Sequence, residues 1–360
     1  MRGGRIAAAV TAIVACGAVL LAGCSAQPNA AETSVPPASG ANSPATGTTP
    51  RPTVHLNVGY IDTSINGVGL TEVANHLGLW KKAGIDVKLT PFTNGPTQIQ
   101  AMAAGSLDIG YIGGGATWMP ATGQAVIVAP SESTYGDFLI ASPKSGAKTV
   151  ADIKGLKVGV PDGGSGEMIL NLALEKAGLT PNDITRVPLD PPAVVSAFVA
   201  GQIDVAAIFS PLSDQIMQSV PNAVKIANNK DFPETVFLGA WVASNQAIQQ
   251  HPDAVERFLE VYAQANDYRI AHHDDTVNWA SAASGAPAAQ LQGQVDALQW
   301  SPSDQIVKDN ADGTTAQRYT NLQALFIKLG RMKQEQSHPI DQWLNTDLFA
   351  QAVKTVEAGQ

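Results

Sequence analysis

The stretch AMAAGSLDI at residues 101–109 decides the fold, because it returns as AFVAGQIDV at residues 197–205 with the same residue type at nearly every position. Each copy joins small and apolar residues to a glycine and an aspartate. We expect a helix that ends at Gly105 or Gly201, where glycine readily adopts the left-handed conformation, and then a turn into a buried strand. A repeated unit of this kind predicts two lobes that share one construction.

Alternating strand and helix patterns surround both copies. Around the first copy, strands are predicted at 55–61, 86–92, 108–112 and 125–129, and helices at 69–83 and 97–104. Around the second copy, after a linking strand at 138–142, strands are predicted at 156–160, 184–189 and 205–209, and helices at 150–154, 167–177 and 193–200. The β-α-β-α-β order predicts an α/β fold with two lobes, each a mixed sheet flanked by helices.

A second crossing between the lobes is predicted at VFLGAWVAS, residues 236–244, because this apolar strand follows the completed second lobe. With the linking strand it gives two crossover strands and therefore a hinge. Beyond Asn245 the residues are mostly helical in pattern, and 253–274 is the longest amphipathic stretch. We assign residues 54–137 and 240–360 to lobe 1 and residues 138–239 to lobe 2; the part after about Trp300 joins lobe 1 only by continuity.

The N-terminal residues are typical of an exported lipoprotein. Arg2 and Arg5 precede an apolar run that closes on Leu-Ala-Gly-Cys at 21–24. This tetrapeptide resembles the bacterial lipobox, which implies a signal peptide at residues 1–23 and a lipidated Cys24 that anchors the mature chain to the extracytoplasmic face of the cell membrane. A signal-anchor helix with an incidental cysteine is the alternative. Residues 24–53 are rich in Ala, Pro, Ser, Thr and Gly and are expected to form a disordered tether.

Composition excludes several classes of function. The chain has 360 residues, a net charge of -9, and 22 Lys and Arg against 31 Asp and Glu, so no positive excess is available to bind nucleic acid. Its 2 cysteines are Cys16 and Cys24, and cleavage before Cys24 leaves neither a disulfide nor a catalytic thiol. His272-His273-Asp274-Asp275 has adjacent residues that point to different helix faces, so we expect a solvated helix end and no metal site.

Several motifs carry a family resemblance. The segments NVGY at 57–60, GLWKKAGIDV at 78–87 and LKVGVP at 156–161, with the paired Ala-Gly-x-x-Asp units, resemble the solute-binding proteins of ABC importers for taurine, nitrate and alkanesulfonates over roughly residues 54–300. The resemblance implies a type II periplasmic-binding-protein fold, in which a small-molecule ligand is trapped between the lobes. It also implies a monomer without cofactor or catalytic residues, whose partners are an ABC permease and its ATPase.

Ligands of open α/β sheets bind beyond the carboxyl ends of the strands, where helix N-termini present free N–H groups. That rule selects six loops rich in Gly, Ser, Thr and Asn, at residues 62–66, 93–95, 113–118, 162–167, 190–192 and 210–214. Residues 163–166 form such a loop before a helix, and their alternative role is a plain helix cap. Neither a P-loop nor a nucleophile elbow fits them. The candidate ligand-binding residues are Ser64, Asn66, Gly114, Gly115, Trp118, Gly164, Ser165, Gly166, Ser210, Asp214 and Trp241.

The charges of these loops bear on the ligand. The loops contain no Arg or Lys, whereas they do contain five acids, which favours a zwitterionic or neutral solute over a hard anion. The acids are Asp62, Asp162, Glu167, Asp190 and Asp214. An alkanesulfonate or taurine-like ligand follows from the resemblance. Nitrate, a thiamine pyrimidine precursor or an aromatic carboxylate stays open, as do a non-transport sensor and an enzyme like the pyrimidine synthases of this fold, although those rely on a cysteine cluster that is absent here.

Overall fold

The computed structural model describes residues 51–359. The signal peptide at 1–23, the lipidated Cys24 and the tether up to residue 50 lie outside the described residues, so those predictions stay as they were. The structured body begins earlier than the expected Val54. Arg51 makes two hydrogen bonds to the carboxylate of Glu260, at 2.7 and 2.5 Å, and Pro52 accepts one from Arg257 at 2.6 Å.

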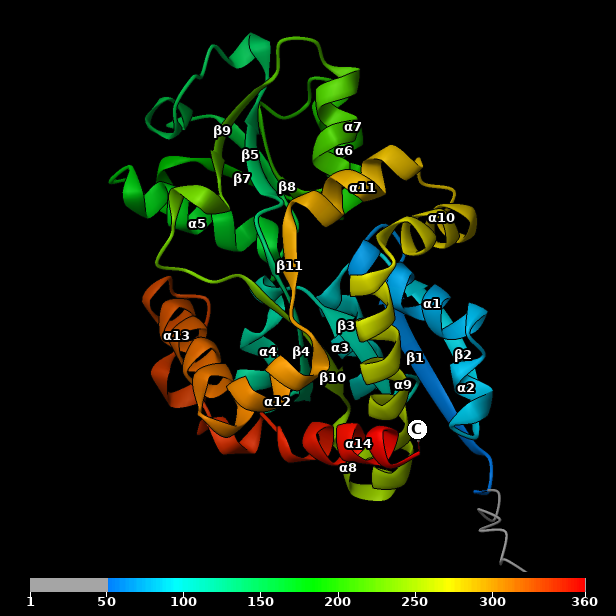
Figure 1. Cartoon of the computed structure of the whole chain (residues 1–360). Coiled ribbons are helices and arrows are strands. Elements are labelled where there is room, and N and C mark those ends of the chain that lie inside the picture. The colour runs from blue at the N-terminus through cyan, green and yellow to red at the C-terminus, as the bar shows by residue number, and fades with distance from the viewer. Residues whose placement is uncertain (1–50, 360) are drawn as a thin grey trace, which may run out of the picture. The chain divides into compact units, whose positions relative to one another are not determined.

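Lobe 1 is built on a six-stranded mixed sheet with the order β11-β4-β10-β3-β1-β2 (Figure 1). Strand β1 runs parallel to β2 and β3, whereas β10 runs antiparallel to β3 and β4, and β11 antiparallel to β4. The strands are β1 Val54–Ile61, β2 Ile85–Phe92, β3 Ile109–Ile112, β4 Val126–Thr134, β10 Leu238–Ala243 and β11 Leu298–Trp300.

Lobe 2 is built on a five-stranded mixed sheet with the order β7-β6-β8-β5-β9. Here β6 runs parallel to β7 and β8, and β5 runs antiparallel to β8 and β9. The strands are β5 Asp137–Ala141, β6 Lys157–Val160, β7 Thr185–Pro188, β8 Val205–Phe209 and β9 Val224–Asn228. The chain passes from lobe 1 to lobe 2 between β4 and β5 and returns between β9 and β10, which gives the two crossings that the sequence predicts.

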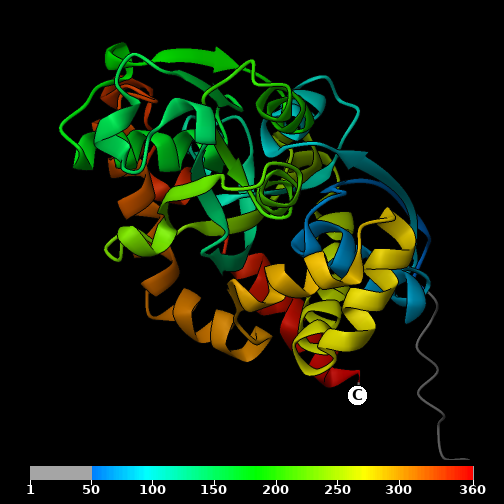
Figure 2. The ribbon, with the colours of Figure 1, turned by 90° about the horizontal axis from the view of Figure 1, so that it is seen from above.

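Helices pack on both sheets, as the view from above in Figure 2 shows. Helix α9 is the longest in the described part of the chain and packs against α1 and α14, while α5 packs against β5 and β8 of lobe 2. The helices are α1 Leu70–His76, α2 Leu79–Lys82, α3 Gly95–Ala103, α4 Trp118–Ala121, α5 Ser165–Lys176, α6 Pro191–Val199, α7 Leu212–Ser219, α8 Asn245–Gln250, α9 Pro252–Ala271, α10 His273–Ser284, α11 Ala288–Asp296, α12 Ser303–Ala311, α13 Thr314–Lys328 and α14 Asp347–Ala358.

The sequence repeat performs the same structural task in both lobes. Gly105 and Gly201 adopt positive φ values of 71° and 70°, which end α3 and α6. The carboxylate of Asp108 then accepts a hydrogen bond from the backbone N–H of Asn57 at 2.8 Å, and that of Asp204 accepts one from Lys157 at 2.9 Å. The aspartates therefore tie β3 to β1 in lobe 1 and β8 to β6 in lobe 2, which explains why the unit contains Gly and Asp at this spacing.

Local differences from the predicted elements have local causes. The helix expected at 69–83 is interrupted where Gly78 takes a positive φ of 63°, so α1 and α2 are separate. The helix expected at 253–274 ends at Ala271, and the one expected at 150–154 is a 3₁₀ turn. Strands β9 and β11 were not predicted, because they are short or have mostly exposed residues. Among residues 51–359, no helix combines the length and apolar character needed to cross a membrane.

Candidate functional site

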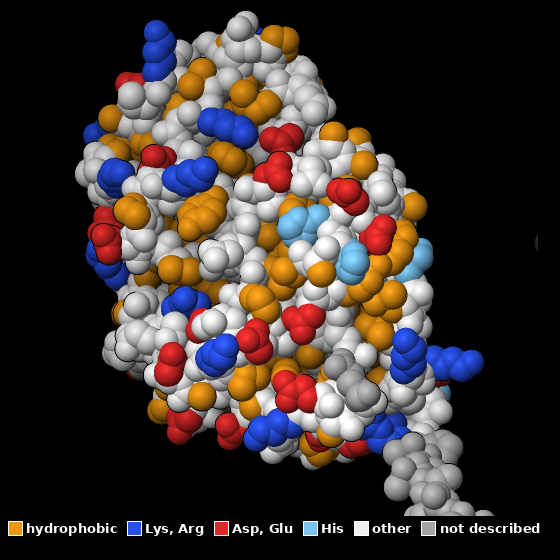
Figure 3. All heavy atoms as spheres, in the orientation of Figure 1, with side chains coloured by type: hydrophobic (Ala, Val, Ile, Leu, Met, Phe, Trp, Pro, Cys, Tyr) orange, Lys and Arg blue, Asp and Glu red, His pale blue; other side chains and the backbone are white. Residues whose placement is uncertain are grey.

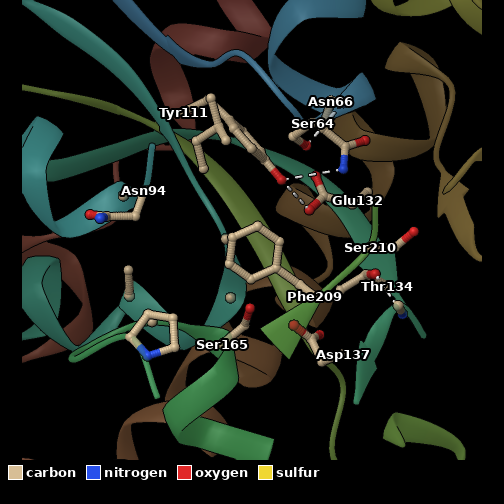
Figure 4. A pocket seen from close by; sticks show the side chains of 18 of the residues that line it. Ser64, Asn66, Asn94, Tyr111, Glu132, Thr134, Asp137, Ser165, Phe209 and Ser210 are labelled. Atoms are coloured by element: carbon tan, nitrogen blue, oxygen red, sulfur yellow. Dashed lines mark hydrogen bonds between the residues drawn. The ribbon is translucent and has the colours of Figure 1, made fainter. Parts of the chain in front are cut away.

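A cavity lies between the two sheets, at the carboxyl ends of β1, β3, β6 and β8. Its empty volume is about 780 Å³, counting the part open to solvent. Loops of both lobes and the first crossing between them form its wall (Figure 4). The lining residues include Ser64, Asn66, Asn94, Tyr111, Gly114, Glu132, Thr134, Asp137, Gly164, Ser165, Phe209, Ser210 and Gln294.

The lobe 1 wall is held by a hydrogen-bond network around Asn66. This side chain donates to the Tyr111 hydroxyl at 3.2 Å and accepts from the Trp300 indole N–H at 2.7 Å. The backbone carbonyl of Asn66 accepts from the buried guanidinium of Arg269 at 3.3 Å. Gln294 fixes the same loop by accepting from the Ile65 N–H at 2.9 Å. Asn66 therefore positions Tyr111, and its own polar atoms are already bonded to the protein.

Glu132, on β4, is the acidic group of this wall. Its side chain receives a 2.6 Å hydrogen bond from the Tyr111 hydroxyl, and the residue is only 2% exposed (Figure 4). The other carboxylate oxygen, Oε2, is buried and has no hydrogen-bond partner within residues 51–359. Burial raises the pKa of Glu132 to about 7, against the opposing effect of the Tyr111 hydrogen bond. Burial likewise holds the pKa of Tyr111 well above its usual value.

A second buried acid, Asp137, starts β5 on the lobe 2 side. Its carboxylate accepts a hydrogen bond from the Asn229 side-chain amide at 2.9 Å, and its backbone N–H donates to Asn229 at 2.7 Å. Burial raises the pKa of Asp137, whereas the hydroxyl of Ser165 and the amide of Asn229 act in the opposite direction. Phe209 presents its ring to the same cavity, between Tyr111 and Asp137 in the view of Figure 4.

The N-terminus of α5 forms another part of the lobe 2 wall. Gly164 is the N-cap residue and offers no side-chain cap to the first backbone N–H groups of the helix, and the Ser165 hydroxyl lies beside the buried carboxylate of Asp137. Gly115 of lobe 1 lies directly against this turn. A Cβ at position 115 would overlap the backbone of Ser165 and Gly164, so only glycine permits this close approach of the lobes.

Beside the cavity, Glu167 of α5 binds two arginines. Its carboxylate accepts hydrogen bonds from the Gly163 N–H at 2.5 Å and from Arg186 at 2.9 Å, and lies 3.3 Å from Arg331 of lobe 1. Arg186 also pairs with Asp162. The Arg331 guanidinium stacks 4.2 Å from the ring of Trp118, whose indole N–H donates to the Gly163 carbonyl at 3.1 Å. This cluster joins the two lobes on one side of the cavity.

Six of the eleven predicted ligand residues line the cavity, and they come from both lobes. They are Ser64, Asn66, Gly114, Gly164, Ser165 and Ser210. The other five lie elsewhere. Gly115 and Trp118 sit at the contact between the lobes, Gly166 packs against the Ala207 carbonyl, and Asp214 accepts a 2.8 Å hydrogen bond from Ser210 outside the cavity.

The placement of Trp241 corrects a prediction. Its side chain is 0% exposed and packs in the lobe 1 core against Tyr111, Phe258 and Tyr262, with ring centroids 5.7, 5.2 and 6.3 Å away. Side chains of a strand alternate between its two faces, and the sequence does not tell which face of β10 is turned toward the cavity. Trp241 is on the face covered by α9, so it supports Tyr111 from behind.

Sequence reasoning missed Tyr111, Glu132 and Asp137. The strand predicted at 125–129 continues as β4 to Thr134, so the predicted elements do not include Glu132. Asp137 directly precedes the predicted linking strand, and Tyr111 belongs to the buried strand predicted at 108–112. A usable signal existed, because Glu132 and Asp137 are two acids within six residues at a predicted crossing between lobes.

The histidines near the α9–α10 junction are on the surface, where Figure 3 shows pale-blue side chains. His272 stacks on Tyr268, with ring centroids 4.2 Å apart, and His273 begins α10. In the described part of the chain, no group of three or more His, Cys, Asp or Glu residues is arranged to hold a metal ion.

Comparison with known proteins gives the family. Residues 69–276 match the family described as NMT1/THI5 like. A Brucella abortus protein, named only as a binding protein, is 40% identical over 281 residues, which cover 78% of this chain and 87% of that protein. The taurine-binding periplasmic protein of Escherichia coli is 24% identical over 251 residues, which cover 67% of this chain and 77% of that protein.

Solved structures share the fold. The alkanesulfonate-binding protein of Xanthomonas axonopodis pv. citri, bound to MOPS, superposes with a TM-score of 0.64 at 23% identity, covering 82% of this chain and 100% of that protein. The likeness confirms the two-lobed periplasmic-binding-protein fold predicted from the sequence.

Proposed function

Because the chain belongs to the NMT1/THI5-like family, we propose that it is the solute-binding component of an ABC importer. It traps a small organic solute between its two lobes and delivers it to a permease that works with an ATPase. The observation that carries this proposal is the cavity, which is enclosed by loops of both lobes and by the crossing between them. A solute that contacts both lobes favours their closed arrangement over the open one.

For the solute itself, we propose an alkanesulfonate or a taurine-like compound. The support comes from the sulfonate- and taurine-binding relatives and from the uncapped N-terminus of α5, whose N–H groups suit the oxygens of a monoanionic head. The Ser64 and Ser165 hydroxyls on the cavity wall are further donors. Phe209 offers an apolar surface to the organic part of the solute.

Binding without catalysis is the function that this wall supports. Nucleophilic catalysis needs a nucleophile beside a base. The lining residues include serines but neither His nor Cys. The hydroxyl of one of these serines, Ser210, donates a hydrogen bond to Asp214 at 2.8 Å, and Asp214 lies outside the cavity. The two cysteines of the chain, Cys16 and Cys24, precede the described residues.

The proposal includes an extracytoplasmic location, with the chain acting as a monomer held to the membrane through a lipid on Cys24. We expect mass spectrometry of the mature N-terminal peptide to find diacylglycerol-modified Cys24 as its first residue. Replacing it, Cys24→Ala, should release the protein from the membrane fraction. An unmodified N-terminus upstream of Cys24 would contradict the anchor without affecting the solute-binding proposal.

A thermal-shift screen of the full-length protein in mild detergent tests the solute class. The screen compares taurine, alkanesulfonates, nitrate, a thiamine pyrimidine and aromatic carboxylates. A ligand at 100 times its Kd stabilises the folded state by about 2.7 kcal/mol, which raises Tm by several degrees. We expect the shift with sulfonates only. A shift only with another class would replace the sulfonate proposal and keep the receptor function.

The variant Ser165→Ala locates the binding. It should weaken the sulfonate shift, because it removes a donor from the cavity wall. Ser196→Ala is the matched control, since Ser196 is an exposed serine of α6 in the same lobe. Equal loss of the shift in both variants would place the binding elsewhere.

A further inference from the structure

We infer that the solute carries a protonated nitrogen and that this group binds the carboxylate of Glu132. The inference rests on the proposed function, because it names the part of the solute that the cavity selects. Its basis is a buried carboxylate oxygen, Oε2, which belongs to a residue of the cavity wall and has no hydrogen-bond partner within residues 51–359. Buried polar atoms of folded proteins are almost always bonded, so beside the Ser131 hydroxyl, which also has no partner within residues 51–359 and which lowers the pKa of Glu132, this oxygen can take a donor from the solute.

The orientation of Glu132 is fixed by the protein. Its Oε1 accepts a 2.6 Å hydrogen bond from Tyr111, and Tyr111 in turn accepts one from Asn66 at 3.2 Å (Figure 4). Gly239 passes directly behind the carboxylate, where any side chain would overlap it. The hydrogen bond to one oxygen and the Gly239 backbone behind the carboxylate keep the group in one orientation. Its second oxygen is therefore a preformed hydrogen-bond acceptor.

No cation of the described chain neutralises this acid. Glu132 forms no ion pair within 4.0 Å, and none of the residues that line the cavity is Lys or Arg. Arg269 is the cation that acts on Glu132 from α9, but its guanidinium is bonded to Asn266 at 2.8 and 3.1 Å and stacks 4.4 Å from the Trp300 ring. The guanidinium also donates to the Asn66 carbonyl at 3.3 Å, so its hydrogen bonds go to groups other than the Glu132 carboxylate.

Asp137 makes the cavity still less suited to a plain anion. It is a second buried acid on the wall, and its partners are the neutral side chains of Asn229 and Ser165. Two buried acids without a basic partner repel an anion and attract a donor-rich cation. A zwitterion satisfies both parts of the wall, with its nitrogen at Glu132 and its anionic head at the N-terminus of α5.

The raised pKa of Glu132 agrees with a cationic group on the solute. Burial raises its pKa to about 7, so near neutral pH the unliganded protein holds part of its population protonated. The groups that face it are Tyr111 of β3, Arg269 and Tyr262 of α9, and Tyr319 of α13. A bound cation favours the carboxylate form, so binding is expected to release protons and to tighten as the pH rises through 7.

Three probes of nearly equal size test the inference. Taurine has an ammonium and a sulfonate, propane-1-sulfonate replaces the ammonium by methyl, and propylamine replaces the sulfonate by methyl. Calorimetric titration of the full-length protein at pH 8 measures each Kd. We expect taurine to bind at least about 30-fold more tightly than propane-1-sulfonate, because an unpaired buried carboxylate is costly.

Variants of Glu132 assign the effect to its charge. Glu132→Gln keeps the shape and should weaken taurine at least about 30-fold while leaving propane-1-sulfonate unchanged or tighter. Glu132→Asp keeps the charge and should retain part of the preference for taurine. Asp304→Asn is the control, because Asp304 is an exposed acid of α12 that pairs with Lys308 at 3.0 Å.

Each outcome decides the inference. Equal binding of taurine and propane-1-sulfonate, or equal loss of both in Glu132→Gln, overturns it and leaves the solute-binding function standing. If propylamine binds through Glu132 and neither sulfonate binds, the inference holds and the sulfonate class fails. If neither nitrogen-bearing probe binds, the inference is overturned.

Discussion

Two buried glutamates, Glu132 of lobe 1 and Glu167 of lobe 2, have opposite surroundings. Both are almost fully buried, at 2% and 5% exposed. Glu167 receives Arg186, Arg331 and the Gly163 N–H, so its charge is balanced within the protein. Glu132 accepts one hydrogen bond from the neutral Tyr111 hydroxyl and forms no ion pair with a cation of the described chain. The same side chain therefore stabilises the contact between the lobes where it is paired, and where it is not paired it is the group that we propose to bind the solute.

The largest expected effect concerns the paired glutamate. Glu167→Gln leaves Arg186 and Arg331 without their carboxylate, and breaking a buried pair on one side costs about 3–5 kcal/mol. Chemical denaturation at pH 7 measures the loss in the free energy of unfolding. A loss below about 1 kcal/mol would show that Glu167 is no more important to folding than a surface acid. Glu175→Gln, which removes an exposed pair with Lys328, is the control.

The unpaired glutamate should give the opposite sign and a strong dependence on pH. In the folded protein the pKa of Glu132 is raised from 4.5 to about 7, so unfolding without ligand becomes easier as the pH rises from 4.5 to 7. The raised pKa of Asp137 acts in the same direction. Glu132→Gln should therefore have little effect on stability near pH 4.5 and should stabilise the unliganded protein by up to about 3 kcal/mol at pH 8.

Measuring Tm of wild type and Glu132→Gln from pH 4.5 to 8.5 checks this prediction. The titratable groups that face Glu132 are the same in both proteins, namely Arg269, which is charged, and the neutral Tyr111, Tyr262 and Tyr319. A variant that is less stable than wild type at pH 8 would mean that Glu132 is paired in solution, and the contrast with Glu167 would disappear.

A smaller effect is expected at Gly115, where lobe 1 is in contact with lobe 2. Gly115→Ala places a Cβ on the backbone of Ser165 and Gly164, so the lobes must move apart. We expect about tenfold weaker solute binding, or 1.4 kcal/mol, with little change in the unfolding of either lobe. Gly293→Ala is the control, because a Cβ there meets nothing within 4 Å. Unchanged affinity would show that the lobes close without this contact.

The smallest effect on binding is expected at Trp241, which lies behind Tyr111. Trp241→Phe should leave the affinity for the solute within about twofold of wild type and cost about 1 kcal/mol of stability through lost packing. Its indole N–H has no hydrogen-bond partner in residues 51–359, so no polar contact is lost. A tenfold loss of affinity in calorimetric titration would mean that support behind Tyr111 controls the orientation of Glu132.

Prediction from sequence succeeded where a feature is local. The Gly and Asp of the repeat end a helix and fix a strand within nine residues, and loops at the ends of predicted strands supplied Ser64, Gly164 and Ser165 to the cavity wall. It failed for Trp241, because the face of a strand that meets the core depends on the neighbouring α9. It also missed Arg331, which is 164 residues from Glu167 in the sequence.

The two α/β lobes, their two crossings and the loops at the strand ends are predictable from the sequence, because periodicity, turn residues and caps act over a few neighbouring residues. Which acids are neutralised depends on the tertiary structure. Glu132 and Glu167 are the same residue type in the sequence. They differ in ion pairing, because the folded chain brings arginines within 4 Å of Glu167 and not of Glu132. Burial and long-range partners set the charge of the cavity, and these exist only after the lobes have folded and met.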